Sequence, residues 1–460
     1  MKAARTHFVC SSCGRVESKW LGRCPDCGSW NSFVEEKVIP AKAETAASPS
    51  LDSRLRKLAD VEVTDSVRVE SGLSEFDRVL GGGIMKPSSV LVGGEPGIGK
   101  STIMLQLLDA CSGRDTVLYV SGEESPGQVK LRAERLHLKL EKINIICDTR
   151  LEVLMDVIDS LKPGVVVIDS LQTLASSTVS SLAGSVNQMR YCCMALSMQA
   201  KAGGIAMFFI GHVTKDGMLA GPKIVEHLVD TVLYFENAQT GVRILRSIKN
   251  RFGSVDEIGI FRMDQDGLTP VRDPSLFFIS SREKGSLPAG IAYTAVAEGS
   301  RTFLVEIQAL TVPCKGGLSR VYSDRIEAAR INRVAAILER HAGLMLSDSD
   351  IYVNVAGGIR LNEVSIELAV ALALWSAKTN TVLDEKQVCF GELSLAGEVR
   401  PVAFLERRIK AASEMGFDHI LAPYSPDIKA QGSLKWCRNI KQAIMISKAH
   451  GLKDESTTPP

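Results

Sequence analysis

The sequence predicts an α/β protein of several domains, and three observations support this prediction. The chain has 460 residues, enough for roughly two to four domains. Over residues 67–273, short apolar runs alternate with segments of helix length, which is typical of a mostly parallel sheet covered by helices on both faces. A second stretch of α/β character spans residues 274–450, and a small cysteine-bearing module occupies residues 1–34.

Two remaining segments and the overall composition limit the possible functions. Residues 35–66 are rich in Ala, Ser and charge without a sustained period, so we predict a linker there, and residues 451–460 are predicted to form a tail. With 45% hydrophobic and 23% charged residues, the composition is that of a soluble globular protein. The formal net charge of +1 provides no global basic field, so any nucleic acid must be bound by local patches.

The sequence shows no feature of a membrane or secreted protein. No apolar run approaches the length that crosses a bilayer, and the first ten residues, MKAARTHFVC, lack the apolar core of a secretory signal. We therefore expect a cytoplasmic protein. Four of the eleven cysteines lie within the first 27 residues, and clustered cysteines in a cytosolic protein favour metal binding over disulfides.

The N-terminal cysteines form two C-x-x-C pairs with ten residues between them. Each pair places two sulfurs on one ion, and two pairs complete a closed tetrahedral site for a structural Zn²⁺. The alternative is a set of free or redox-active cysteines. Because so small a module cannot bury a sufficient core, we expect metal binding to be coupled to its folding. The predicted metal ligands are Cys10, Cys13, Cys24 and Cys27.

The aromatic and basic residues of this module allow three interpretations. Trp20, Arg23 and Trp30 could face a nucleic acid, face another protein, or simply pack on the module. Structural zinc does not distinguish among these partners.

The segment GEPGIGKS, residues 94–101, fits the phosphate-loop pattern G-x-x-x-x-G-K-[ST]. An apolar strand precedes it and a helical stretch follows, which argues against a chance match. Glycines allow the backbone N–H groups to point at phosphate oxygens, and the helix N-terminus adds a positive dipole end. In this pattern Lys100 neutralises the β- and γ-phosphates and Ser101 ligates Mg²⁺. The predicted ATP-binding residues are Gly94, Glu95, Pro96, Gly97, Ile98, Gly99, Lys100, Ser101 and Thr102.

Acidic residues follow two other predicted strands. Asp169 ends the apolar run VVVID, where it would lie beside the phosphates and the metal; the alternative is a helix cap. Glu123 and Glu124 end the run in YVSGEES, and one of them is a candidate to polarise the attacking water; the alternative is a solvated loop acid. His212 follows the strand GIAMFFI, and its spacing allows either a γ-phosphate sensor or a structural histidine.

The segment IKNRFG, Ile248 to Gly253, places two basic side chains, an amide and an aromatic ring between two predicted strands. The residues alone leave open whether this cluster contacts a phosphate, a nucleic acid or water.

Together these motifs resemble the bacterial RadA/Sms family of DNA-repair ATPases along nearly the whole chain. The resemblance implies a zinc ribbon, a RecA-like P-loop ATPase core and a C-terminal α/β domain similar to the Lon protease domain. It also implies a homo-hexameric ring that binds single-stranded and branched DNA, has the recombinase RecA as a partner, and uses ATP and Mg²⁺ to promote branch migration of recombination intermediates. The segments that carry the resemblance are the C-x-x-C pairs with WLGRCPDCGSWN, SGLSEFDRVLGGG, GEPGIGKST, YVSGEES, VVVIDSLQT, GHVTKDGMLAGP, EHLVDTVLYFE, IKNRFG, NVAGGIRLNE and FGELSLAGEVRPV.

The resemblance also assigns roles to individual residues. It implies that Glu123 activates the water and that His212 senses the γ-phosphate. Lys249 and Arg251 would act as catalytic cations that reach either the neighbouring subunit's nucleotide or the DNA, since a cation supplied in trans stabilises charge on the transferring phosphoryl group. The family motif covers Lys249, Asn250, Arg251, Phe252 and Gly253.

A Lon-type protease would need a serine nucleophile and a lysine base. Alignment with the Lon motifs places Ser365 at the nucleophile position and Glu406 at the lysine position, with Lys410 one helical turn further along. We expect Arg407 and Arg408 to hold Glu406 ionised, which makes it a weak base. We therefore interpret Ser365 as a residue at a helix start, where it could act as a cap, and not as a nucleophile, and the domain as a proteolytically inactive scaffold for assembly and DNA contact.

Two helices are predicted in the C-terminal stretch, near Ser323–His341 and Val364–Lys378. Four arginines of the first helix could contact phosphates or could form a solvated charged face: Arg325, Arg330, Arg333 and Arg340. Three functions are therefore compared: a DNA-stimulated ATPase, an ATP-dependent protease, and an ATP-gated assembly factor for a recombinase or helicase.

Overall fold

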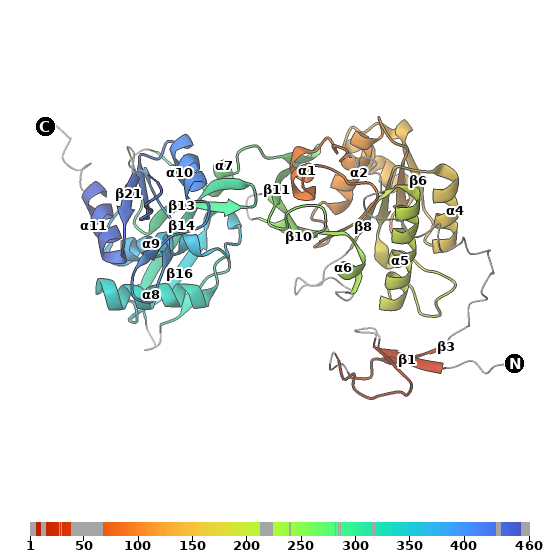
Figure 1. The fold of residues 1–460 in the computed structure, drawn as a ribbon, viewed down its shortest axis with the longest axis horizontal. Coiled ribbons are helices and arrows are strands. Elements are labelled where there is room, and N and C mark those ends of the chain that lie inside the picture. The colour runs from red at the N-terminus through yellow and green to blue at the C-terminus, as the bar shows by residue number, and fades with distance from the viewer. Residues whose placement is uncertain are drawn as a thin grey trace. The chain divides into compact units, whose positions relative to one another are not determined.

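The computed structural model (Figure 1) describes residues 6–10, 15–26, 28, 30–37, 68–211, 224–238, 241–280, 282–283, 285, 287–314, 319–428 and 434–451. Contacts divide the chain into two compact units, and the main boundary falls between Pro270 and Val271. None of the helices in these residues combines the length and apolar character needed to span a membrane.

The N-terminal module is a three-stranded antiparallel sheet with the order β2-β1-β3. The strands are β1 (Thr6–Cys10), β2 (Val16–Glu17) and β3 (Phe33–Lys37). Cys10 and Cys24 are buried together against Phe33, so the small core forms around cysteine sulfurs. β3 continues to Lys37, three residues past the predicted end of the module.

The first α/β unit contains a nine-stranded sheet with the order β12-β11-β10-β9-β4-β8-β7-β5-β6. Strands β4 to β9 pair in parallel, and β11 and β12 form an antiparallel hairpin. The strands are β4 (Ser88–Gly94), β5 (Val117–Ser121), β6 (Ile143–Ile146), β7 (Val165–Asp169), β8 (Ala206–Ile210), β9 (Thr231–Asn237), β10 (Val242–Asn250), β11 (Ile258–Asp264) and β12 (Gly267–Pro270).

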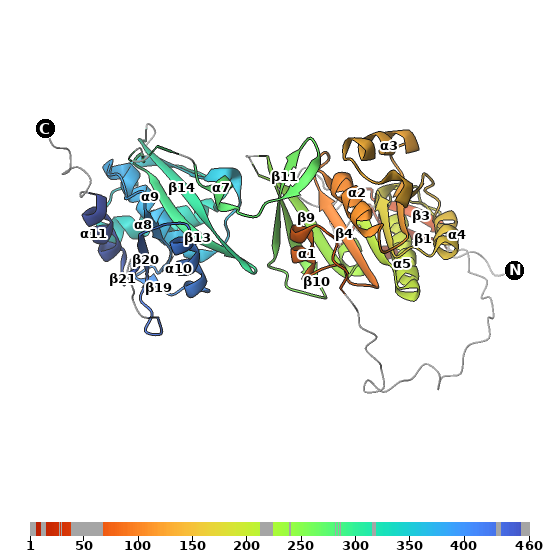
Figure 2. The same ribbon diagram turned by 90° about the horizontal axis from the view of Figure 1, so that it is seen from above.

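Helices cover both faces of this sheet. Val90 and Val92 of β4 pack in one core cluster with residues of α2, whereas Leu91 packs in a second cluster with residues of α4 and α5. Both faces of the sheet are therefore buried under helices, which explains why the strands appear in the sequence as continuous apolar runs. Figure 2 shows α2 and α5 on opposite sides of the strands. The helices are α1 (Ser74–Leu80), α2 (Lys100–Cys111), α3 (Pro126–Arg135), α4 (Leu151–Leu161), α5 (Val186–Gly203) and α6 (Ile224–Leu228).

The C-terminal unit is built on a seven-stranded mixed sheet with the order β15-β16-β14-β13-β17-β20-β21, and β18 and β19 form a separate hairpin. The strands are β13 (Ile291–Glu298), β14 (Arg301–Pro313), β15 (Val321–Tyr322), β16 (Ser349–Val355), β17 (Gln387–Cys389), β18 (Glu392–Leu393), β19 (Val399–Arg400), β20 (His419–Pro423) and β21 (Leu434–Cys437). The helices are α7 (Ser275–Phe278), α8 (Ala328–Ala342), α9 (Glu367–Thr379), α10 (Leu405–Glu414) and α11 (Ile440–Gly451).

The two predicted C-terminal helices are present with shifted starts. The first begins at Ala328 and not at Ser323, because Ser323 forms a turn in which its hydroxyl accepts from the Ile326 N–H at 3.3 Å. The second begins with a 3₁₀ turn over Val364–Ile366 and becomes α-helical at Glu367.

Candidate nucleotide-binding site

The phosphate loop connects β4 to α2, as the motif predicts. Gly94, Gly97 and Gly99 have φ angles of 152°, 75° and 116°, in the region that favours glycine. A Cβ on Gly99 would come within 2.6 Å of the Met263 methyl carbon. The loop therefore requires glycine here for its backbone angle and for its close approach to β11.

Lys100 begins α2 and is 5% exposed. Its ammonium donates to the carbonyl oxygens of Gly94 at 2.7 Å and Glu95 at 2.9 Å. Burial lowers the pKa of Lys100, and the negative charges of Asp169 and Glu123 act in the opposite direction. The lysine is thus a desolvated cation at the phosphate loop, for which phosphate oxygens would be stronger acceptors than the carbonyls.

Asp169 lies where its strand position predicts, at the carboxyl end of β7 opposite Ser121 of β5. The Tyr119 hydroxyl donates to Asp169 Oδ2 at 2.5 Å, and both side chains are buried. Burial and the neighbouring Asp169 raise the pKa of Tyr119 well above its usual range. Sequence reasoning missed Tyr119, because within the apolar run TVLYV it looks like a core residue.

The structure separates the two candidate glutamates. Glu123 Oε1 accepts from the Ser170 hydroxyl at 2.6 Å, next to Asp169, and its charge acts on Lys100. Glu124 instead accepts from Arg132 Nη2 at 2.5 Å. Glu123 therefore faces the phosphate loop, while Glu124 is held by an arginine of α3.

A pocket of about 610 Å³ opens beside the phosphate loop, within the range typical of small-molecule sites. Two of its walls come from parts of the chain that carry no motif. One wall is the C-terminal end of α3. The other is the β11–β12 hairpin, which Gln106 of α2 fixes by hydrogen bonds to the Leu268 backbone at 3.0 and 3.2 Å. The lining residues outside the predicted motif are Arg132, Arg135, Leu136, Met263, Asp264, Gln265 and Gly267.

The IKNRFG segment lies at the opposite end of the strands from the phosphate loop of the same chain. At the start of β10, Arg243 Nε donates to the loop carbonyl of Ile98 at 3.2 Å. At the end of the strand, Asn250 approaches Thr231, the first residue of β9. Lys249 follows Arg243 by six positions, roughly 20 Å of extended strand, so it lies far along β10 from the loop that Arg243 contacts.

The basic side chains of this segment have partners at that end of the strands. Lys249 Nζ donates to the carbonyls of Glu226 at 2.9 Å, His227 at 3.3 Å and Val229 at 2.7 Å, at the C-terminal end of α6. Burial and the nearby Arg251 lower the pKa of Lys249. Arg251 pairs with Asp230 at 3.2 Å, and its side chain is 54% exposed.

The other residues of the segment are structural. Asn250 donates to the Val79 and Leu80 carbonyls at the end of α1 and accepts from the Phe252 N–H at 2.9 Å. A Cβ on Gly253 would lie 3.1 Å from the Gly81 backbone. The Asn250 amide and Gly253 therefore fix the turn against α1, and Phe252 contributes through its backbone N–H. His212, the predicted γ-phosphate sensor, lies outside the described residues.

The N-terminal module fits the predicted zinc site as far as it is described. Cys10 and Cys24 belong to different C-x-x-C pairs, and they are 0% and 1% exposed in one cluster. Cys13 and Cys27 lie outside the described residues. Buried sulfurs contributed by both pairs match the geometry of two knuckles that share one ion.

Comparisons with known proteins agree with this geometry. Residues 8–35 match the family described as the rubredoxin metal binding domain, residues 69–145 match the ATPase family described as KaiC, and residues 322–426 match subunit ChlI of Mg-chelatase. The DNA repair protein RadA of Treponema pallidum is 49% identical over 424 residues, which cover 92% of each chain. The proteins of the same name from Bacillus subtilis and Listeria monocytogenes are 44% and 43% identical, over 92% of this chain and 93% of theirs.

The chain belongs to the RadA family. It is an ATP-hydrolysing enzyme, and the predicted fold class is confirmed: a zinc ribbon, a RecA-like P-loop core and a Lon-like C-terminal α/β domain.

In this RadA-family chain, Ser365 lies in the 3₁₀ turn that leads into α9, so its prediction as a residue at a helix start is confirmed. Ser365 is 1% exposed, and no described residue hydrogen bonds to its hydroxyl, so it does not act as a helix cap. Among the charged side chains of α10, Arg408 is buried, whereas Glu406 is exposed. Arg408 pairs with Glu363 at 2.5 Å, and Arg407 packs on Phe404. The expectation that both arginines hold Glu406 is thus also wrong, because they have other partners.

The arginines of α8 are mostly structural. Arg330 donates to the carbonyls of Asn362 and Glu363, and Arg333 pairs with the buried carboxylate of Glu367. These two residues therefore have intramolecular partners near the start of α9, and phosphate contact by the arginines stays a prediction. Arg340 is exposed, and Arg325 is partly buried.

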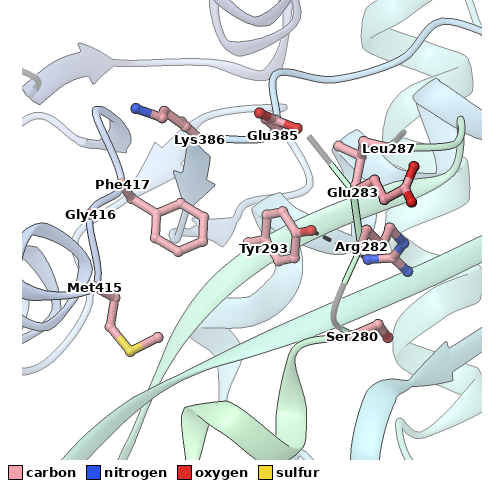
Figure 3. A pocket seen from close by; sticks show the side chains of 10 residues that line it. All are labelled: Ser280, Arg282, Glu283, Leu287, Tyr293, Glu385, Lys386, Met415, Gly416 and Phe417. Atoms are coloured by element: carbon pink, nitrogen blue, oxygen red, sulfur yellow. Dashed lines mark hydrogen bonds between the residues drawn. The ribbon is translucent and has the colours of Figure 1, made fainter. Parts of the chain in front are cut away.

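The pocket of the C-terminal unit shown in Figure 3 does not include Ser365. Its volume is about 240 Å³, and Arg282 at its wall pairs with the fully buried Glu306 through contacts of 2.7 and 2.6 Å. The Tyr293 hydroxyl points toward Arg282, and its ring meets that of Phe417 edge-on with centroids 5.3 Å apart. The lining residues are Ser280, Arg282, Glu283, Leu287, Tyr293, Glu385, Lys386, Met415, Gly416 and Phe417.

Proposed function

We propose that the chain is a DNA-dependent ATPase of recombinational DNA repair, which binds single-stranded DNA and promotes branch migration of recombination intermediates. Its relatives carry the name DNA repair protein, which supports the repair role. We further propose a cytoplasmic homo-hexamer with branched DNA and the recombinase RecA as partners.

The nucleotide site supports the hydrolytic part of this proposal. Lys100 would hold the β- and γ-phosphates, and Glu123, oriented by Ser170, would polarise the attacking water. Asp169 and Ser101 would hold Mg²⁺, which supplies charge neutralisation to the phosphates when bound. The Tyr119 hydroxyl fixes the orientation of the Asp169 carboxylate.

One observation supports the proposed coupling of hydrolysis to assembly and DNA. β10 places Lys249 and Arg251 at the end of the strands opposite the phosphate loop of their own chain. Cations in that position can serve phosphoryl transfer only at another subunit's nucleotide. Ile248 and Val255 are 49% and 47% exposed beside the half-exposed Arg251, a mixture of apolar and basic side chains that suits a subunit boundary. We infer that Lys249 and Arg251 reach the neighbouring subunit's nucleotide; contact with the DNA is the alternative.

The proposal is tested by steady-state ATP hydrolysis with and without single-stranded DNA at fixed salt. Wild type, Lys249→Ala and the blank Lys100→Ala are compared. The proposal expects DNA to stimulate the wild type, and expects Lys249→Ala to lose hydrolysis or its stimulation. If DNA changes nothing and Lys249→Ala behaves as the wild type, the motor function is rejected, and an ATP-gated assembly factor becomes the better account.

The protease alternative has no support at the Lon positions. Glu406, at the lysine position, is exposed. The buried basic residue of the same helix, Arg408, pairs with Glu363 and cannot act as a base, because its guanidinium stays charged. The expectation is no peptide cleavage by the wild type, measured with casein, and no change on Ser365→Ala.

A further inference from the structure

Two tryptophans of the zinc ribbon are exposed to solvent. Trp20 is 52% exposed and Trp30 is 71% exposed, although indoles are usually well buried. Arg23 pairs with Trp30 in an isolated antiparallel bridge, and Trp20 precedes Arg23 by three residues. These rings do not form the core of the module, which consists of Cys10, Cys24 and Phe33 with Phe8 packed against them.

The charges around these rings are unbalanced. Within the described part of residues 15–30, the carboxylates are Glu17 and Asp26, and Arg15 pairs with both of them. Lys19 and Arg23, the other two basic residues there, are exposed. The Arg23 guanidinium lies 5.7 Å from the Trp30 ring centroid, and its Nε donates to the Gly28 carbonyl at 3.1 Å. Two exposed cations, Lys19 and Arg23, therefore accompany the two exposed rings in this segment of the chain.

We propose that this tryptophan face, formed by Lys19, Trp20, Arg23 and Trp30, binds single-stranded nucleic acid. Exposed aromatic rings stack on bases of any sequence, and neighbouring cations contact the phosphates. The exposed cations Lys19 and Arg23, the second of which lies over the Trp30 ring, favour a polyanion over an apolar protein surface. This inference rests on the proposed handling of single-stranded DNA and names a site for it outside the ATPase core.

Intrinsic fluorescence tests the inference in the full-length, zinc-loaded protein. The other two tryptophans are Trp375, which is 4% exposed, and Trp436, which is partly buried. Oligothymidylate is expected to quench the emission of Trp20 and Trp30 in the wild type. Trp20→Phe/Trp30→Phe keeps an aromatic surface and removes the reporters, so quenching is lost while affinity by anisotropy is retained.

Alanine variants measure the size of the effect. Trp20→Ala/Trp30→Ala is expected to bind oligothymidylate at least about fivefold more weakly, the lower limit for loss of one stacked base. Lys19→Gln is expected to reduce the slope of log affinity against log salt by about 0.7, as for one phosphate contact on a single strand. Zinc content near one ion per chain verifies that each variant keeps its ribbon, and hydrolysis without DNA is expected to be unchanged.

Two results would overturn the inference, and they differ in what else they reject. If the alanine variant holds zinc and binds oligothymidylate as tightly as the wild type, the face does not bind nucleic acid and is better explained as a protein-docking surface. The proposed ATPase function would survive that result. If the wild type neither binds oligothymidylate nor responds to it in hydrolysis, the proposed function and this inference are rejected together.

Discussion

Replacing Arg408 by methionine is expected to destabilise the C-terminal unit by about 3 kcal/mol. Arg408 is 2% exposed, donates to the Ala403 carbonyl at 2.9 Å and contacts Glu363 at 2.5 and 3.1 Å. Removal of one partner of a buried ion pair costs about 3–5 kcal/mol, because the other charge stays uncompensated. The side chain of Glu363 is 22% exposed, so water can partly solvate it and the lower limit applies.

Urea unfolding measures this effect in a Trp20→Phe/Trp30→Phe background. The remaining emission then comes from Trp375 and Trp436, both in the C-terminal unit. A loss of about 3 kcal/mol corresponds to a midpoint lowered by about 1 M urea for a unit of this size. Glu406→Gln on the exposed side of the same helix is the matched control and is expected to stay within about 0.5 kcal/mol of the parent.

A second substitution tests whether the uncompensated charge causes the loss. Arg408→Met/Glu363→Met removes both charges and is expected to be more stable than Arg408→Met alone. A midpoint for Arg408→Met equal to that of Glu406→Gln would refute the role of this ion pair in holding the unit together.

Three other predictions concern the ATPase core and the ribbon. Tyr119→Phe removes the hydrogen bond to Asp169. Because a hydrogen bond to a charged group is worth about 1.5–3 kcal/mol, the steady-state rate of hydrolysis should fall by about 10-fold or more, while circular dichroism shows unchanged folding. An unchanged rate would contradict this role of Tyr119. Gly99→Ala should abolish ATP binding in a fluorescent-nucleotide titration, because the φ angle of 116° at Gly99 is strained for a residue with a side chain. Gly113→Ala, whose Cβ meets nothing within 4 Å, should bind ATP normally. Removal of zinc by a chelator should unfold the ribbon and leave ATP affinity intact; loss of ATP affinity would show that the ribbon is needed by the core.

The sequence predicts the parts of the site that local physics determines. The phosphate loop needs glycines at Gly94, Gly97 and Gly99 for their positive φ angles, so the motif identifies it without any tertiary information. Asp169 ends an apolar run, and the carboxyl ends of parallel strands lie side by side at one end of the sheet. These features were therefore predicted at their observed positions.

Features that depend on contacts between distant segments could not be predicted in this way. The choice between Glu123 and Glu124 depends on Ser170 and Arg132, and neither contact leaves a pattern in the sequence. The β11–β12 wall of the pocket lies more than 150 residues after the loop that it covers. Likewise, the partners of Arg330 on α8 are set by packing, so the sequence left open whether this arginine contacts a phosphate or belongs to a solvated charged face.

The position of IKNRFG shows the same limit. Its sequence presents two cations and gives no indication of which end of the strands they occupy. The length of β10 and the contact of Arg243 with Ile98 decide this, because they place Lys249 at the end of β10 farthest from the phosphate loop. The strand thus decides where in the sheet this local motif lies, which the sequence of the motif does not reveal.

The most direct test of the central claim mixes two inactive variants in one assembly. Lys249→Ala chains keep an intact phosphate loop, and Lys100→Ala chains keep Lys249. In a head-to-tail ring formed by random co-assembly, about a quarter of the interfaces would combine an intact nucleotide site with an intact Lys249 from the neighbour. The account predicts that co-expressed, differently tagged variants recover DNA-stimulated ATP hydrolysis that neither shows alone. If the mixed assemblies form and remain inactive, Lys249 acts within its own chain or on DNA, and action on the neighbour's nucleotide is contradicted.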